Sequence, residues 1–155
     1  MSQSHAVTDY PQLQLENQLC FPLYAASRLL TRLYQDELTP LGLTYPQYIV
    51  MMILWSDSPC SVKQLGERAM LNTNTLTPLL KRLESLGYVQ RSRGIEDERV
   101  RLFAVTKSGW ALREACVAIP MALLAKLAAH DVALGQLKLA LDQVLPGLCA
   151  ASSDV

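Results

Sequence analysis

Apolar residues recur at helical spacing along most of the chain, except in one stretch past its midpoint. The N-terminal part carries one apolar stripe whose members are separated by alternating steps of four and three, which predicts an α-helix. These members are Leu19, Leu23, Ala26, Leu30 and Leu33. After position 87 the period becomes two in residues 88–93 and 99–105, on either side of a charged turn, and this predicts a β-hairpin.

Capping residues, glycines and prolines divide the rest of the chain into further helices. The expected helices cover about residues 13–40, 45–55, 61–68, 75–86, 107–127 and 131–148. Pro22 is expected to distort the first helix beside Cys20, because proline lacks the backbone N–H of a helical residue. Ser61 and Thr106 are expected to cap the helices that follow them.

The predicted order is four helices, a hairpin and two helices, a mainly α (α+β) fold of the winged helix-turn-helix type. In such a fold the second helix of a close pair can lie in the major groove of DNA. We expect a flexible tail at residues 1–12 and a single domain at 13–150. Within it, residues 61–106 would bind DNA, and residues 13–42 and 107–150 would be dimerisation helices.

Charge supports DNA binding only once its distribution is considered. Fourteen basic residues balance fourteen acidic ones, whereas nucleic-acid binders usually carry excess positive charge. Between positions 81 and 107, however, basic residues outnumber acidic ones. They are Lys81, Arg82, Arg91, Arg93, Arg99, Arg101 and Lys107. The hairpin arginines alternate along their strands and so share a face. A phosphate backbone is the expected counter-charge for this face. The alternative is a hairpin whose arginines are only solvated.

The start of the fourth helix offers polar side chains that can bond to base edges. The predicted DNA-contacting residues here are Thr73, Asn74, Thr75, Thr77 and Lys81, with Arg82 beside them. Simple helix capping is the alternative role for one or two of them. The apolar stripes of the first and last helices predict a homodimer on pseudo-palindromic operator DNA, unless those helices pack only on their own chain.

Other classes of protein are disfavoured. No apolar run is long enough to cross a bilayer, and the polar N-terminus lacks the apolar stretch of a signal peptide, so a cytoplasmic protein without membrane contact is expected. The four cysteines, Cys20, Cys60, Cys116 and Cys149, have no zinc-site spacing. We expect no structural disulfide, no metal, no cofactor and no enzyme activity.

Several segments in this order resemble organic hydroperoxide resistance regulators, a branch of the MarR family. They are LENQLCFPLY at 15–24, LTYPQY at 43–48, LGER at 65–68, TLTPLLKRL at 75–83 and DER at 97–99. The resemblance spans about residues 13–120. It implies a repressor that binds DNA when reduced and is released when organic hydroperoxide oxidises one cysteine, here Cys20. It also implies that Tyr24, Tyr34 and Tyr45 surround this cysteine, and that Arg99, oriented by Asp97, enters the minor groove.

Spacing adds a constraint on this implied pocket. Cys20 and Tyr34 are fourteen residues apart, which is about 21 Å on a continuous helix, so Tyr34 cannot bond to the Cys20 of its own chain. We therefore expect the sensor pocket to form across the dimer interface, so that oxidation changes the spacing of the two DNA-reading helices.

Two departures from the family pattern leave details open. Asn72-Thr73-Asn74 stands where relatives often have Asp-Ser-Gly, which puts inherited base contacts in doubt. Residues 121–133 lack the resolving cysteine of some relatives, so Cys116, another cysteine or a low-molecular-weight thiol could resolve oxidised Cys20. The alternative is that Cys60, Cys116 and Cys149 are only packing or surface residues. Two other functions are alternatives: a repressor released by a small aromatic ligand, and a thiol peroxidase, which would leave the basic hairpin unexplained.

Overall fold

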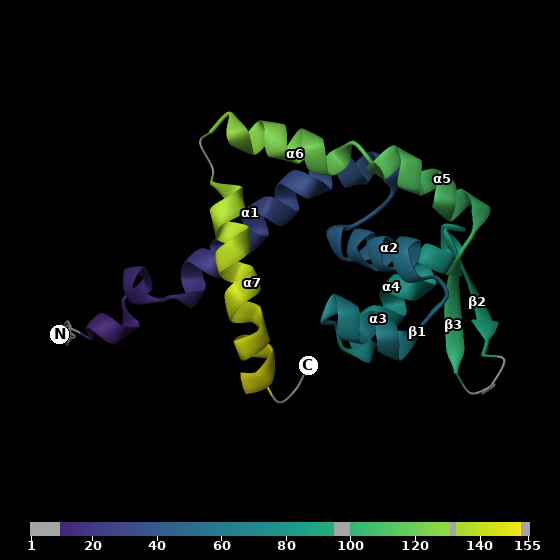
Figure 1. The fold of residues 1–155 in the computed structure, drawn as a ribbon, viewed down its shortest axis with the longest axis horizontal. Coiled ribbons are helices and arrows are strands. Elements are labelled where there is room, and N and C mark those ends of the chain that lie inside the picture. The colour runs from purple at the N-terminus through teal and green to yellow at the C-terminus, as the bar shows by residue number, and fades with distance from the viewer. Residues whose placement is uncertain (1–9, 95–99, 131–132, 153–155) are drawn as a thin grey trace, which may run out of the picture.

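The computed structural model describes residues 10–94, 100–130 and 133–152 (Figure 1). Its helices are α1 (Cys20–Leu38), α2 (Tyr45–Asp57), α3 (Val62–Ala69), α4 (Thr73–Ser85), α5 (Lys107–Cys116), α6 (Ile119–Ala128) and α7 (Leu134–Ala151). Its strands are β1 (Cys60–Ser61), β2 (Val89–Arg93) and β3 (Arg101–Val105), and short 3₁₀ helices cover Pro11–Leu13, Leu15–Asn17 and Thr39–Leu41. The mainly helical fold with a small sheet agrees with the predicted class.

The first helix begins later than its apolar stripe predicts. Two 3₁₀ turns occupy residues 11–17, and α1 starts only at Cys20. Pro22 is the third residue of α1, where a backbone N–H has no partner within the helix in any case. The expected distortion at Pro22 is therefore wrong, and α1 runs unbroken to Leu38.

The sheet contains a strand that the sequence pattern missed. In the described part of the chain, three antiparallel strands are ordered β1-β3-β2. Val89 lies opposite Val105, as expected for the hairpin, and Cys60 of the short β1 lies opposite Phe103. The N–H of Val105 also donates to Ser58 Oγ at 3.0 Å, which fixes the base of the hairpin against the end of α2.

The core surrounds α2, whose Val50, Met51 and Leu54 are fully buried among leucines of α3 and α4. The apolar pattern of residues 45–55 favours Ile49, Met52 and Ile53 as inward residues, but Met52 is 40 % exposed and Met51 takes the core position. Most faces of α2 are apolar, so periodicity alone did not identify the buried face.

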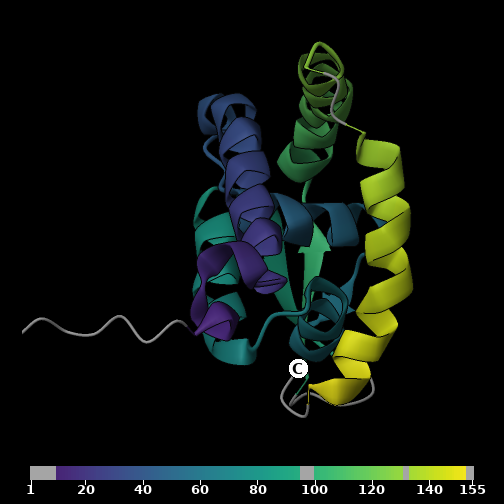
Figure 2. The ribbon, with the colours of Figure 1, turned by 90° about the vertical axis from the view of Figure 1, so that its left-hand side faces the viewer.

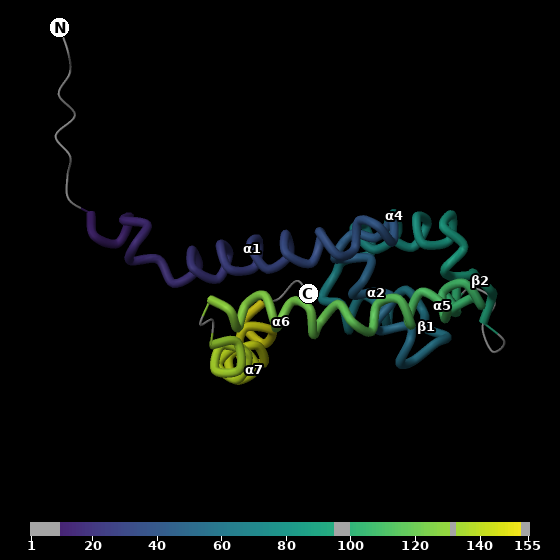
Figure 3. Tube along the Cα trace, turned by 90° about the horizontal axis from the view of Figure 1, so that it is seen from above, coloured from purple at the N-terminus to yellow at the C-terminus, as the bar shows by residue number. Residues whose placement is uncertain are grey.

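Helices α1, α6 and α7 form a terminal arm that extends from this core (Figures 1 and 3). The single helix expected at 107–127 is divided into α5 and α6, because Pro120 occupies the second position of α6 and cannot continue a helix from α5. Helix α6 runs beside α1, and Lys126 Nζ donates to Glu37 Oε1 at 2.7 Å. No described helix is long and apolar enough to cross a membrane.

Candidate nucleic-acid interface and cysteine site

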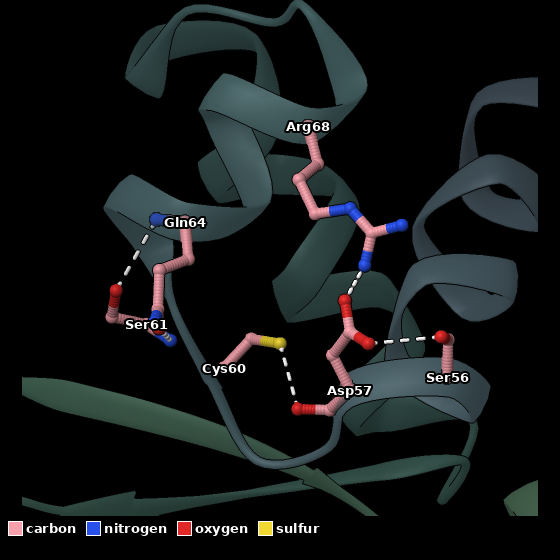
Figure 4. Close-up of polar contacts among 6 residues, drawn as sticks. All are labelled: Ser56, Asp57, Cys60, Ser61, Gln64 and Arg68. Atoms are coloured by element: carbon pink, nitrogen blue, oxygen red, sulfur yellow. Dashed lines mark hydrogen bonds and ion pairs between the residues drawn. The ribbon is translucent and has the colours of Figure 1, made fainter.

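Local capping fixes the two helices of the predicted helix-turn-helix. Ser61 and Gln64 form a reciprocal capping box at the start of α3, with Gln64 N–H donating to Ser61 Oγ at 3.2 Å and Ser61 N–H donating to Gln64 Oε1 at 2.8 Å (Figure 4). The side chain of Asn72 accepts the N–H of Thr75 at 2.9 Å and caps α4. Asn72 is thus occupied at the helix start, which gives a structural reason for its place in the turn.

A polar cluster joins α3 to the preceding helix α2 (Figure 4). Arg68 of α3 forms an ion pair with Asp57, the last residue of α2. Ser56 Oγ donates to Asp57 Oδ1 at 2.9 Å, and Cys60 Sγ donates to the carbonyl of Asp57 at 3.2 Å. These contacts set the angle between α2 and α3, and through the α3–α4 turn they help to set the position of α4.

Helix α4 presents its polar side to solvent while Leu76, Leu80 and Leu83 face the core. The predicted DNA-contacting residues on this helix are all exposed: Thr73, Asn74, Thr75, Thr77, Lys81 and Arg82. Thr77 Oγ1 donates to the carbonyl of Thr73 at 2.7 Å, so its hydroxyl proton is used within the helix. Thr77 can then only accept a bond from a base edge.

The hairpin brings its basic residues to the same side of the molecule as α4. Arg93 lies directly opposite Arg101 in the register, and both are exposed. Arg91 Nε lies 3.7 Å from Glu84 Oε1 of α4, an ion pair that ties the strand to the helix. Asp97 and Arg99, predicted to reach the minor groove, lie outside the described residues.

A cleft of about 530 Å³ separates α4 from the hairpin. Its apolar lining includes Val62, Leu80, Val100 and Phe103. Its cationic lining consists of Lys63, Lys81, Arg91 and Arg101, with Glu84 as the acidic residue among the lining groups. This face therefore combines positive charge with a concave apolar surface.

Cys20 is exposed as the first residue of α1. Tyr24, one turn further on and 57 % exposed, accepts a hydrogen bond from Arg28 Nη1 at 2.8 Å, and the guanidinium also stacks over its ring at 5.5 Å. With its oxygen accepting from Arg28, the phenol keeps its own proton available for another acceptor. Within one chain, Tyr24 is the predicted pocket tyrosine that lies near Cys20.

Tyr34 and Tyr45 instead lie together at the other end of α1, with ring centroids 4.8 Å apart. Because α1 is unbroken, Tyr34 lies about 21 Å along the helix from Cys20 of the same chain. Burial, and then the nearby Tyr45, raise the pKa of Tyr34, and burial raises the pKa of Tyr45. Both phenols are protonated at neutral pH and are able to donate.

Two further aromatic residues extend this pair, and the sequence reasoning missed both. Tyr48 lies 6.0 Å from Tyr34 between ring centroids, and Trp55 packs edge-on against Tyr48 at 6.2 Å. Burial, followed by Cys116, raises the pKa of Tyr48 to about 12. Trp55 Nε1 donates to the carbonyl of Gly109 in α5 at 2.9 Å. The helical spacing that Tyr45, Tyr48 and Trp55 share in the sequence was the signal that could have identified them.

Comparisons with known proteins agree with this arrangement. Residues 32–115 match the family of SarA/Rot transcriptional regulators. The organic hydroperoxide resistance transcriptional regulator of Bacillus subtilis is 43 % identical over 90 % of this chain and 95 % of its own. The chain belongs to the MarR/SarA family of transcriptional regulators. It is therefore a DNA-binding regulator and not an enzyme.

Solved structures of relatives share the winged helix-turn-helix fold of this regulator. Reduced AbfR of Staphylococcus epidermidis bound to DNA has 33 % identity and a TM-score of 0.74, covering 91 % of this chain and 96 % of its own. The disulfide form of AbfR has 35 % identity and a TM-score of 0.62, covering 90 % and 95 %. Apo MarR of E. coli, at 24 % identity, shares the fold with a TM-score of 0.70, covering 83 % and 98 %.

The other three cysteines of the regulator divide into buried and exposed thiols. Cys60 and Cys116 are 3 % and 2 % exposed, and burial raises the pKa of both thiols. Cys149, near the end of α7, is exposed. Within the part of the chain that the structure describes, no group of three or more His, Cys, Asp or Glu side chains is arranged to hold a metal ion.

Proposed function

We propose that this regulator is a repressor that leaves its operator when an organic hydroperoxide oxidises Cys20. The observation that carries the proposal is an exposed thiol at the start of α1 in a chain whose fold presents α4 and a basic hairpin for DNA. A cysteine thiolate is the nucleophile that peroxides oxidise to sulfenic acid. The similarity to a hydroperoxide resistance regulator, and to a relative solved in reduced and disulfide forms, supports it.

The same proposal includes a homodimer whose two chains share the sensor pocket. Helix α7, which the structure describes in full, has no buried residue, and α1 buries only Leu38. Leu23 of α1 and Leu148 of α7 are among the apolar side chains left exposed. A twofold interface would cover both helices and would allow Tyr34 of one chain to reach Cys20 of the other.

A series of side-chain contacts joins that pocket to the DNA-binding half of the chain, which comprises α2, α3, α4 and the sheet. Tyr34 contacts Tyr45 and Tyr48, and Tyr48 contacts Trp55, whose indole bonds to α5 at Gly109. Gly109 packs so closely on the start of the hairpin that a Cβ there would lie 2.1 Å from the carbonyl oxygen of Tyr88. A shift of Tyr34 on oxidation would therefore be passed to the base of the hairpin.

The test is a DNA-shift assay on the region upstream of the chain's own gene. Cumene hydroperoxide is expected to release the wild-type protein and to leave Cys20→Ser bound, while cumyl alcohol, which lacks the O–O bond, releases neither. Restoring binding with dithiothreitol would show that the change is reversible thiol oxidation. Equal release of Cys20→Ser by the hydroperoxide would contradict the proposal.

The cleft between α4 and the hairpin favours a second candidate, a repressor released by a small aromatic acid. Its apolar residues suit a ring, and Arg91 and Arg101 suit a carboxylate. A ligand there would lie on the DNA-binding face and compete with DNA. Benzoate or a similar acid should then release wild type and Cys20→Ser equally, and Arg91→Ala should bind the acid more weakly when binding is measured without DNA.

A further inference from the structure

We infer that Cys149 is the thiol that closes a disulfide on oxidised Cys20. The inference rests on the proposed function, because it requires hydroperoxide to oxidise Cys20 first. It names a residue for the resolving step, for which the sequence had left Cys116, another cysteine and an external thiol as alternatives.

Accessibility separates the three thiols that could take this role. All four cysteines are described, and only Cys20 and Cys149 are exposed. Cys60 lies opposite Phe103 in the sheet and donates to the carbonyl of Asp57. Cys116 belongs to the same core cluster as Tyr48. Either buried thiol could meet Cys20 only if the core opened, whereas Cys149 already faces solvent.

Cys20 and Cys149 belong to the two helices that line one groove. Residues of α1 and α7 line an apolar groove of about 390 Å³: Leu23, Ala26, Ser27, Leu30 and Thr31 from α1, Leu137, Leu141, Leu145 and Leu148 from α7, with Tyr45 beside them. Successive residues of an α-helix are rotated by about 100° about the helix axis. By this rotation Cys20 lies within the arc of α1 that these groove residues span. Cys149 follows Leu148 directly, at the edge of the α7 face.

The helices that carry the two cysteines cross beside this groove. In Figure 1, α7 crosses α1, and both the first turns of α1 and the last turns of α7 lie below the crossing. Figure 2 shows α7 standing to one side of α1 and of the helix-turn-helix. No residue of α7 is buried within its own chain, so the contacts that oppose a movement of this helix toward a reactive sulfur are those of the proposed dimer.

The chemistry balances without a further oxidant. The Cys20 thiolate attacks the terminal oxygen of the hydroperoxide, the O–O bond breaks, and the alkoxide takes a proton from water to leave as the alcohol. Cys20 is then a sulfenic acid. The Cys149 thiolate attacks this sulfur, the S–O bond breaks, hydroxide leaves, and the S–S bond forms. Two electrons pass from the two thiols to the peroxide.

Tryptic peptide mapping can identify the partner directly, because each cysteine falls in a different tryptic peptide. These peptides are 1–28 for Cys20, 33–63 for Cys60, 114–126 for Cys116 and 139–155 for Cys149. The full-length wild-type protein would be treated with one equivalent of cumene hydroperoxide, with no added thiol, then alkylated and digested without reductant. We expect a linked pair of peptides 1–28 and 139–155 that dithiothreitol separates.

Variants give the second measurement. Cys149→Ser should lose the linked pair and instead leave Cys20 as a sulfenic acid that dimedone traps, and its exposed site should let it fold normally. Cys116→Ala should keep the Cys20–Cys149 link. A link from Cys20 to Cys116 or Cys60, or a dimedone adduct on wild-type Cys20 with Cys149 still a free thiol, would overturn the inference alone. Absence of any oxidation at Cys20 would overturn the proposed function as well.

Discussion

The DNA-binding half and the terminal arm carry similar apolar stripes, but the two stripes are buried to different extents. In the DNA-binding half, six of the thirteen residues of α2 are buried, and α4 buries three leucines against it. In the terminal arm, α1 buries one residue of nineteen and α7 buries none. One chain therefore completes the core under α4 and leaves the stripes of its end helices open.

This difference separates two sources of stability in the regulator. Burial of apolar surface is the main favourable term in folding, so the DNA-binding half can fold on contacts within one chain. The terminal arm gains little from its leucines until another surface covers them. A dimer that depends on the arm would then position two preformed DNA-reading units, and changes in the arm would alter their spacing without unfolding them.

The largest expected effect comes from placing a charge in the open stripe. Leu145→Glu on α7 should weaken dimerisation by at least about 3 kcal/mol, since each of the two copies loses a leucine worth roughly 1.5–3 kcal/mol. Sedimentation should show the 17.2 kDa monomer with an unchanged helical circular dichroism signal. Gln143→Glu adds the same charge to the opposite face of α7 and should remain dimeric. A Leu145→Glu dimer would remove the distinction between the two halves.

The next effect tests the core of the DNA-binding half. Leu54→Ala should lower the free energy of unfolding by about 2–5 kcal/mol, because a fully buried leucine leaves a cavity. Met52→Ala, on the exposed side of the same helix, should cost clearly less. Urea unfolding followed by circular dichroism measures both. Similar losses for the two variants would mean that the core under α4 is not the main source of stability.

Local signals in the sequence predicted much of this architecture. Ser61 and Thr106 cap their helices as expected, with Thr106 Oγ1 accepting the N–H of Gly109 at 3.1 Å. The period-two segments pair as the predicted hairpin. Such features depend on residues close together in the chain, so the sequence pattern contains them.

Features set by contacts between distant residues were harder to predict. Strand β1 has two residues, too few for any period, and exists because β3 lies beside it. The bond from Trp55 to Gly109 joins positions 54 residues apart. The spacing of the cysteines in the sequence did not show which of them are accessible to solvent. Only the packed structure separates the buried Cys116 from the exposed Cys149. The roles of Tyr24, Tyr34 and Tyr45 toward Cys20 stay predictions until the dimer is tested.

The smallest expected effect on stability concerns the link between the two halves. Trp55→Phe keeps the ring against Tyr48 but removes the hydrogen bond to Gly109, which should cost roughly 0.5–1.5 kcal/mol. DNA affinity of the reduced protein should change little, while release by cumene hydroperoxide should need more oxidant, because α5 no longer follows the aromatic cluster. Trp110→Phe, an exposed indole on α5 stacked with Arg113, is the matched control. If both variants respond to hydroperoxide as wild type does, the signal from Cys20 reaches the hairpin by another route.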